Sequence, residues 1–179
     1  MDELVEFLRA RLDEEELWAT EASRSDDSQT TAGGVHWQWV EPETDTPVTA
    51  DPSRGEHLTD DAGHFRFALR SVEEFPTEHV GPLPQFAIPS AEEISAAVAG
   101  HIVRHDPARV LREIEAKRRL LDEHKPDRPK GRPNMERHCL TCTTAQAWDE
   151  TASESNCLTL RLLALPYEDR PGYREDWRP

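Results

Sequence analysis

The sequence predicts an α+β fold in which helices predominate, completed by a small antiparallel β-ribbon and a cysteine-rich knuckle near the C-terminus. Apolar residues recur at helical spacing over residues 2–23 and 107–124. They alternate with polar residues over residues 35–40 and 64–72, as they do in half-buried strands. The three cysteines all come late in the chain. A length of 179 residues suits a single domain, residues 1–179.

The first element is an amphipathic helix over residues 2–23. Asp2, Glu3 and Glu6 fall in its first turn, where the helix dipole favours anions. The apolar residues share one broad face: Leu4, Val5, Phe7, Leu8, Leu12, Trp18, Ala19 and Ala22. We therefore expect this face to be buried.

Two strands follow, with the sequences VHWQWV (35–40) and HFRFALRSV (64–72). Each has one apolar side, so the two are predicted to pair as an antiparallel ribbon. A two-stranded ribbon is marginal by itself and needs a helix or a third strand to pack on. Residues 75–89 contain four prolines and are predicted to be an extended connector.

The central helices are predicted from their first residues. Ser90-Ala91-Glu92-Glu93 matches a capping box, which predicts a helix from there to about Arg104. Asp106-Pro107 supplies an N-cap and a proline at the first helical position, which predicts a second helix over residues 107–124. A short buried helix is expected from Leu158 to Leu165, followed by a tail that packs as an extended aromatic strap.

Two segments are predicted to be mobile loops, residues 24–62 and residues 125–137. The first encloses the VHWQWV strand and is otherwise rich in polar residues. The second contains three prolines, one glycine and five basic residues. No apolar run is long enough to cross a bilayer, and the first residues lack the pattern of a signal peptide. The expected location is the cytoplasm, with no membrane partner.

The charge is distributed unevenly along the chain. The net charge is −15; residues 1–99 hold 22 acidic and 6 basic residues, and residues 100–179 hold 14 acidic and 15 basic residues. An acidic field repels phosphates, so the composition argues against nucleic acid as a partner and leaves a protein partner open. A run of acidic residues also has the simpler role of keeping the protein soluble.

The cysteines predict a structural zinc site. Cys139 and Cys142 have the C-x2-C spacing that lets two thiolates reach one tetrahedral zinc ion, and Cys157 supplies a third. His138 or His124 is the expected fourth ligand. Two other interpretations stay open: free thiols that pack as small apolar groups, and a redox-active C-x2-C pair. Cys157 precedes a predicted helix, whose dipole is expected to lower the pKa of its thiol.

A second cluster lies earlier in the chain. His101 and His105 are four residues apart, which puts both imidazoles on one side of a helix, and Asp106 follows directly. This spacing resembles that of H-E-x-x-H zinc enzymes, but the glutamate base is missing. The simpler interpretation is a pair of histidines without a functional role at a helix end, followed by an aspartate that caps the next helix.

Three stretches of the chain resemble a family of uncharacterised actinobacterial proteins grouped only as a domain of unknown function. They are HIVRHDPARVLREIEAKRRLLDEH (101–124), CLTLRLLALPYEDRPGYREDWRP (157–179) and the opening MDELVEFLRARLDEEE. The resemblance implies a cytoplasmic protein of an actinobacterium or its phage, and no activity. Members of the family share a C-x2-C and a later cysteine, which match Cys139, Cys142 and Cys157.

Taken together, these patterns favour a small, acidic, non-enzymatic interaction or accessory protein stabilised by structural zinc. The first alternative is a metal-dependent, hydrolase-like enzyme that uses His101, His105 and Asp106. The second is an acidic mimic of nucleic acid that inhibits a nucleic-acid-binding protein, with residues 41–62 as its main surface. No catalytic residue and no small-molecule substrate is assigned from the sequence.

Overall fold

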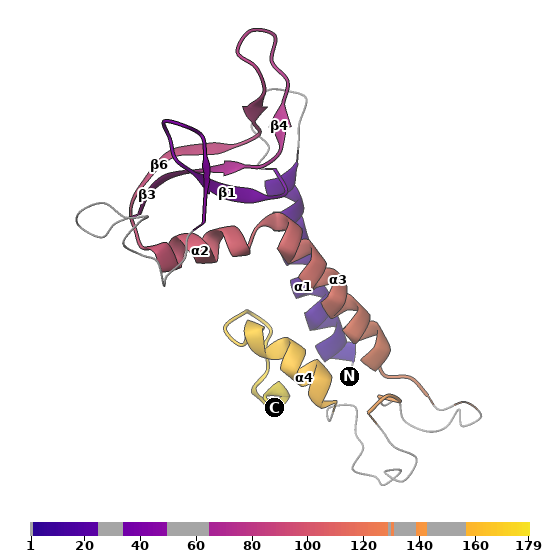
Figure 1. Ribbon diagram of the computed structural model, residues 1–179. Coiled ribbons are helices and arrows are strands. Elements are labelled where there is room, and N and C mark those ends of the chain that lie inside the picture. Colours follow the sequence, from indigo (N-terminus) through magenta and orange to yellow (C-terminus); the bar gives the residue numbers. More distant parts are fainter. Residues whose placement is uncertain (1, 25–33, 50–64, 129, 131–138, 143–156) are drawn as a thin grey trace. The chain divides into compact units, whose positions relative to one another are not determined.

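The structure is a computed structural model and confirms the α+β class (Figure 1). The residues that it describes are 2–24, 34–49, 65–128, 130, 139–142 and 157–179. Their contacts divide the chain into two compact units. Unit 1 comprises residues 1–15 and 113–179, and unit 2 comprises residues 16–112. The single domain over residues 1–179 stays a prediction.

The first helix, α1, covers Asp2–Ser23, as predicted. Its buried side chains are Leu4, Val5, Leu8, Leu12 and Ala19. Trp18 was expected on the same face but is 70% exposed. The expectation that Trp18 is buried is therefore wrong: helical periodicity identifies an apolar stripe but not which of its edges a neighbouring element covers.

Unit 2 is built on a four-stranded antiparallel sheet in the order β2-β1-β3-β6. The strands are β1 (Trp37–Val40), β2 (Pro47–Val48), β3 (Phe65–Ser71) and β6 (Ala87–Ile94). The predicted pairing of the two alternating segments is confirmed by the β1–β3 ladder, which puts Trp39 opposite Leu69. β6 supplies the third strand that the ribbon requires.

The capping box at Ser90 is a wrong prediction, because Ser90 lies within β6. The chain remains extended to Ile94, and the helix α2 begins at Ala96 and ends at Arg104. Its N-cap is Ser95, whose Oγ accepts a hydrogen bond from the backbone N–H of Val98 at 3.3 Å. Residues 75–89 were predicted to be only an extended connector. They take part in a short antiparallel hairpin of β4 (Glu74–Phe75) and β5 (Leu83–Pro84).

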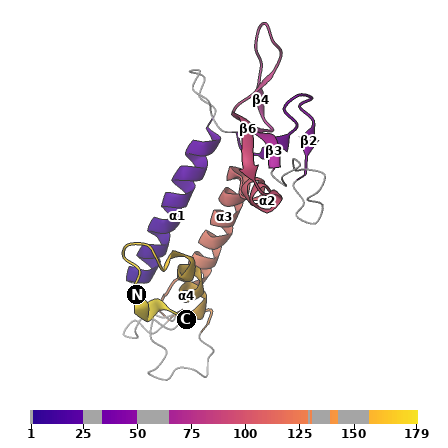
Figure 2. The ribbon, with the colours of Figure 1, turned by 90° about the vertical axis from the view of Figure 1, so that its left-hand side faces the viewer.

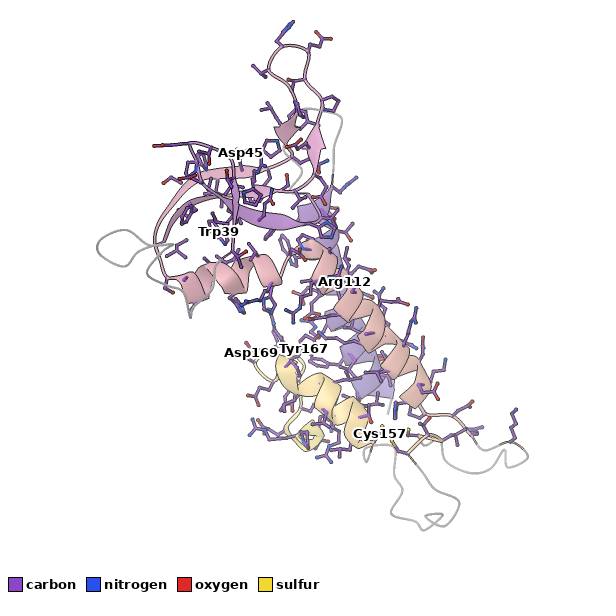
Figure 3. All side chains as sticks on the ribbon, in the orientation of Figure 1. Trp39, Asp45, Arg112, Cys157, Tyr167 and Asp169 are labelled. Carbon is purple, nitrogen blue, oxygen red and sulfur yellow. The ribbon has the colours of Figure 1, made fainter. Side chains whose placement is uncertain are left out.

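The core of unit 2 lies between the sheet and α2, which runs across one face of the sheet in Figure 1. The buried residues of this cluster are Trp39, Leu69, Ala91, Ala96 and Ala99. The alanines allow the helix to approach closely, and the Trp39 indole N–H donates to the backbone carbonyl of Ala99 at 2.8 Å. Figure 3 labels Trp39 at this position.

The entry to β1 is held by a carboxylate. Glu73 Oε2 accepts the backbone N–H of Val35 at 3.0 Å and that of His36 at 3.1 Å. Its other oxygen lies 2.6 Å from Nδ1 of the His36 ring. Gly34 directly before this turn has φ +65°, and an added Cβ would lie 2.4 Å from Cβ of Ser71. Only glycine fits this close approach.

The helix α3 covers Pro107–His124, and its start confirms the prediction from Asp106-Pro107. Asp106 Oδ1 accepts the backbone N–H of Arg109 at 2.8 Å. The helix α4 covers Leu158–Ala164 and is followed by 3-10 turns at Leu165–Tyr167 and Glu175–Trp177. Within the described residues, no helix combines the length and the apolar character needed to cross a membrane.

Candidate metal centre

The candidate metal centre lies in unit 1, on a scaffold of α1, α3 and α4. Leu8 and Leu12 of α1, Leu121 of α3, and Leu163 and Tyr167 line one apolar contact region. Leu160 and Ala164, one turn apart on α4, are fully buried. Burial of apolar area is the main source of stability in such a contact.

Ion pairs at the rim of this region join α1 to α3. Lys117 Nζ donates to Glu15 Oε2 and to the Tyr167 hydroxyl, each at 3.2 Å. Arg118 donates to Asp13 Oδ1 at 2.6 Å. Burial acts to lower the pKa of Lys117, but the hydrogen bond to Tyr167 and the charge of Glu15 raise it on balance. The ammonium is therefore retained in its half-buried position.

The aromatic side chains of the C-terminal tail pack against Phe7 of α1. The tail forms turns, so the prediction of an extended strap is wrong. The Phe7 ring centroid lies 5.2 Å from that of Trp177 and 6.1 Å from that of Tyr173. Arg161 of α4 donates to the backbone carbonyl of Trp177 at 3.2 Å. Trp177 is 7% exposed. The tail therefore fixes α4 to the first turns of α1.

At one end of this scaffold, three cysteine sulfurs surround one imidazole nitrogen. Nδ1 of His124, the last residue of α3, lies 3.5 Å from Cys139 Sγ, 3.2 Å from Cys142 Sγ and 3.7 Å from Cys157 Sγ. The sulfurs of Cys142 and Cys157 are 3.7 Å apart. All four donor atoms lie within 4.8 Å of one another. In Figure 3, Cys157 is labelled at the start of α4.

These distances fit the edges of a zinc tetrahedron. With Zn–S bonds of about 2.3 Å and a Zn–N bond of about 2.0 Å, ideal S–S edges are about 3.8 Å and S–N edges about 3.5 Å. The observed separations of 3.2–3.7 Å match both kinds of edge. Three sulfurs and one imidazole form a donor set that suits zinc. The four side chains can therefore hold a metal ion of this kind.

Local hydrogen bonds position the donors. The backbone N–H of Cys142 donates to Cys139 Sγ at 3.4 Å, which fixes the turn of the C-x2-C segment. The Thr141 hydroxyl donates to the carbonyl of Glu123 at 2.7 Å and joins this turn to the last turn of α3. Cys157 is the N-cap residue of α4. Figure 2 shows α4 beside the C-terminal end of α3, from another direction than Figure 1.

Burial controls the acidity of the thiols. Burial raises the pKa of Cys157 to about 12, although a backbone hydrogen bond from Leu160 acts to lower it. Burial also raises the pKa of Cys139. The prediction that the dipole of α4 lowers the pKa of Cys157 is therefore wrong. Desolvation of a thiolate outweighs the effect of a helix N-terminus, and a bound cation would reverse this balance.

The structure also places the other residues singled out in the sequence. His138 lies outside the described residues, and His124 is the imidazole beside the cysteines. His101 and His105 stack, with ring centroids 4.1 Å apart, while Asp106 caps α3. Among described residues these three do not form a further group of metal ligands. The acidic surface proposed for residues 41–62 is described only to residue 49, where it is exposed apart from Val48.

Comparison with known proteins gives a family but no activity. No curated protein and no solved structure matches the chain. One family model matches over residues 1–179, and its description is "Family of unknown function (DUF6221)". The match spans both units and includes all four donor residues. The chain belongs to this family of unknown function, in agreement with the resemblance found in its sequence.

Proposed function

We propose that the protein is a non-enzymatic interaction or accessory protein whose unit 1 is organised by a structural zinc ion. The ligands are His124, Cys139, Cys142 and Cys157. The observation that carries this proposal is the ring of three sulfurs at 3.2–3.7 Å from one imidazole nitrogen. Free thiols would account for one of these contacts, because the lone pair of Nδ1 accepts one S–H hydrogen bond, but not for three sulfurs around the same nitrogen.

The donor set supports a structural role over a catalytic one. Four protein ligands complete the tetrahedral coordination of zinc, whereas a catalytic zinc keeps a position open for water or substrate. The group contains no carboxylate that would act as a general base beside the ion. Two of the three cysteines, Cys139 and Cys157, are buried. Zinc in this position would join three segments of chain and carry out no chemistry.

The stabilising effect of the ion follows from the sequence separation of its ligands. His124 is the last residue of α3, Cys139 and Cys142 belong to one turn, and Cys157 begins α4. An ion bound by all three segments closes the loops between them, so its binding free energy contributes directly to folding. A reducing cytoplasm, which keeps thiols free, suits such a site.

A protein partner is supported by the surface next to the site. Leu140 follows Cys139 and is 42% exposed, and Leu158 follows Cys157 and is 53% exposed. Leu162 lies one turn further along α4 and is 51% exposed. Exposed leucines that depend on a metal for their position offer an apolar contact area to a partner. The acidic N-terminal half disfavours nucleic acid in the same role.

The test is the zinc content of protein purified without a metal-affinity tag, measured by elemental analysis. We expect about one zinc per chain. Cys142→Ser should lose the zinc and lower the melting temperature by roughly 5 °C or more, since several kcal/mol of binding free energy are removed. Zinc-free wild-type protein would overturn the proposal.

A matched pair of variants identifies the fourth ligand. His124→Asn should lose zinc, because its Nδ1 is the nitrogen among the sulfurs. His138→Asn should retain zinc with unchanged stoichiometry. Loss of zinc from His138→Asn, with zinc retained in His124→Asn, would show that His138 is the fourth ligand. It would not contradict the zinc site itself.

A further inference from the structure

His101 and His105 are a pair of imidazoles at the end of α2 in unit 2, whereas the cysteine site belongs to unit 1. Both side chains are exposed. Their ring centroids are 4.1 Å apart and the rings are inclined by 35°. His101 lies in the last turn of α2, and His105 is the C-cap residue that follows it. Two imidazoles therefore face the same volume of solvent at one helix end.

The hydrogen bond between them determines which nitrogen is available. Nδ1 of His105 lies 2.8 Å from the backbone carbonyl oxygen of His101. A carbonyl oxygen can only accept, so Nδ1 carries the proton and Nε2 of the neutral ring has a free lone pair. Metal-binding imidazoles commonly donate their other N–H to a backbone carbonyl in this way. Among the described residues, none makes a hydrogen bond to the ring of His101.

The surroundings restrict the kind of ion that fits. In the part of the chain that the structure describes, Asp106 does not join the two imidazoles as a third ligand, and its Oδ1 accepts the backbone N–H of Arg109. Arg109 also donates to the backbone carbonyl of Arg104 at 3.0 Å, so its guanidinium group lies at the end of α2. Hard ions such as Mg²⁺ and Ca²⁺ require oxygen ligands and gain nothing here. Cu²⁺, Ni²⁺ and Zn²⁺ bind neutral imidazole.

We infer that His101 and His105 chelate one divalent transition-metal ion through their imidazole nitrogens. Two protein ligands leave the remaining coordination positions to water or to a donor group of another molecule. The cysteine site, in contrast, offers four protein ligands. Metal binding by the two histidines does not depend on zinc at the cysteine site. Its ligands are exposed at the end of α2, so the ion exchanges readily with solvent.

The test is a titration of the untagged, zinc-loaded chain with Ni²⁺, followed by calorimetry and by NMR. We expect one further equivalent of metal, with paramagnetic loss of signals from residues around His101 and His105. His101→Ala should weaken the binding roughly tenfold or more, because a single imidazole lacks the chelate advantage. His105→Gln should do the same, while its amide N–H can still donate to the carbonyl of His101 and preserve the helix end.

His79→Ala is the control, since His79 is a single exposed histidine on the β4–β5 hairpin; its nickel affinity should equal that of the wild type. Equal affinity in all variants would overturn the inference. So would nickel uptake that is matched by an equal release of zinc, because that result places the nickel at the cysteine site.

Discussion

At the residue scale, Glu73 shows how one carboxylate can organise a strand. It accepts two backbone N–H groups at the entry to β1 and contacts the His36 ring. Burial acts to raise its pKa, but the hydrogen bonds from His36 lower the pKa below the ordinary value of 4.5. The charged form is therefore the one that the fold stabilises.

This lowered pKa predicts a loss of stability in acid. The unfolded carboxyl takes up a proton near its ordinary pKa, whereas the folded one does so at lower pH, so the contribution of Glu73 is full above about pH 4.5 and disappears below the folded pKa. Glu73→Gln should be less stable than the wild type at neutral pH, and the difference should narrow toward about pH 3. Urea unfolding across this range measures it. A difference that stays constant with pH would contradict the ionic role of Glu73.

The metal ligands show what spacing can and cannot determine. Cys139, Cys142 and Cys157 were predicted because C-x2-C is a spacing imposed by tetrahedral coordination. The histidine was left as His138 or His124, since both are close enough in the chain. The choice depends on whether the end of α3 brings His124 to the cysteines. That depends on the tertiary packing of Leu121 and its neighbours, and the spacing of residues in the sequence does not reveal this packing.

At the element scale, the boundary between β6 and α2 shows competition between local and tertiary signals. Ser90-Ala91-Glu92-Glu93 has the residues of a capping box, yet these residues lie in β6. Ala91 faces Phe67 of β3 in the ladder and is buried. Pairing in the sheet and burial of Ala91 outweigh a local signal worth about 1 kcal/mol. The next serine, Ser95, then takes the N-cap position.

The two serines provide a direct test of this boundary. Ser95→Ala should reduce the free energy of unfolding by about 1 kcal/mol, because the Val98 N–H loses its acceptor. Ser90→Ala should change it by less than about 0.5 kcal/mol, because Ser90 is exposed on a strand. Both values come from denaturant titration. A larger effect at Ser90 would favour the helix start that the capping box predicted.

Elements with a long apolar period were predictable, and short ones were not. α1 and α3 repeat their pattern over several turns, and Asp106-Pro107 adds an unambiguous start. The β4–β5 hairpin has only two residues in each strand and includes Pro84, so no period exists to detect. Its pairing depends on neighbours in space, which explains why the connector was predicted to be merely extended.

At the scale of the whole molecule, the metal centre and the sheet belong to different compact units. All four candidate metal ligands lie in unit 1, whereas the core of Trp39, Leu69 and Ala99 lies in unit 2. Removal of the metal should therefore affect the two units unequally.

Hydrogen exchange with and without a strong zinc chelator tests this expectation. Chelation should accelerate exchange of amides in the described part of unit 1, above all in α4 and the end of α3. Amides of β1 and β3 should retain their protection, because their hydrogen bonds depend on the sheet and α2. Equal acceleration in both units would show that the ion stabilises the chain as one cooperative unit.

The aromatic contact of Phe7 with Tyr173 and Trp177 has a consequence for synthesis of the chain. Residues 1–15 leave the ribosome before their packing partners Tyr173 and Trp177, and before the candidate ligand Cys157, are made. The buried cluster of Trp39, Leu69 and Ala99 lies within residues 16–112, so all of its members are made before α4 and the C-terminal tail. Until residues 157–179 have emerged, Phe7 lacks these aromatic partners and is accessible to chaperones and proteases.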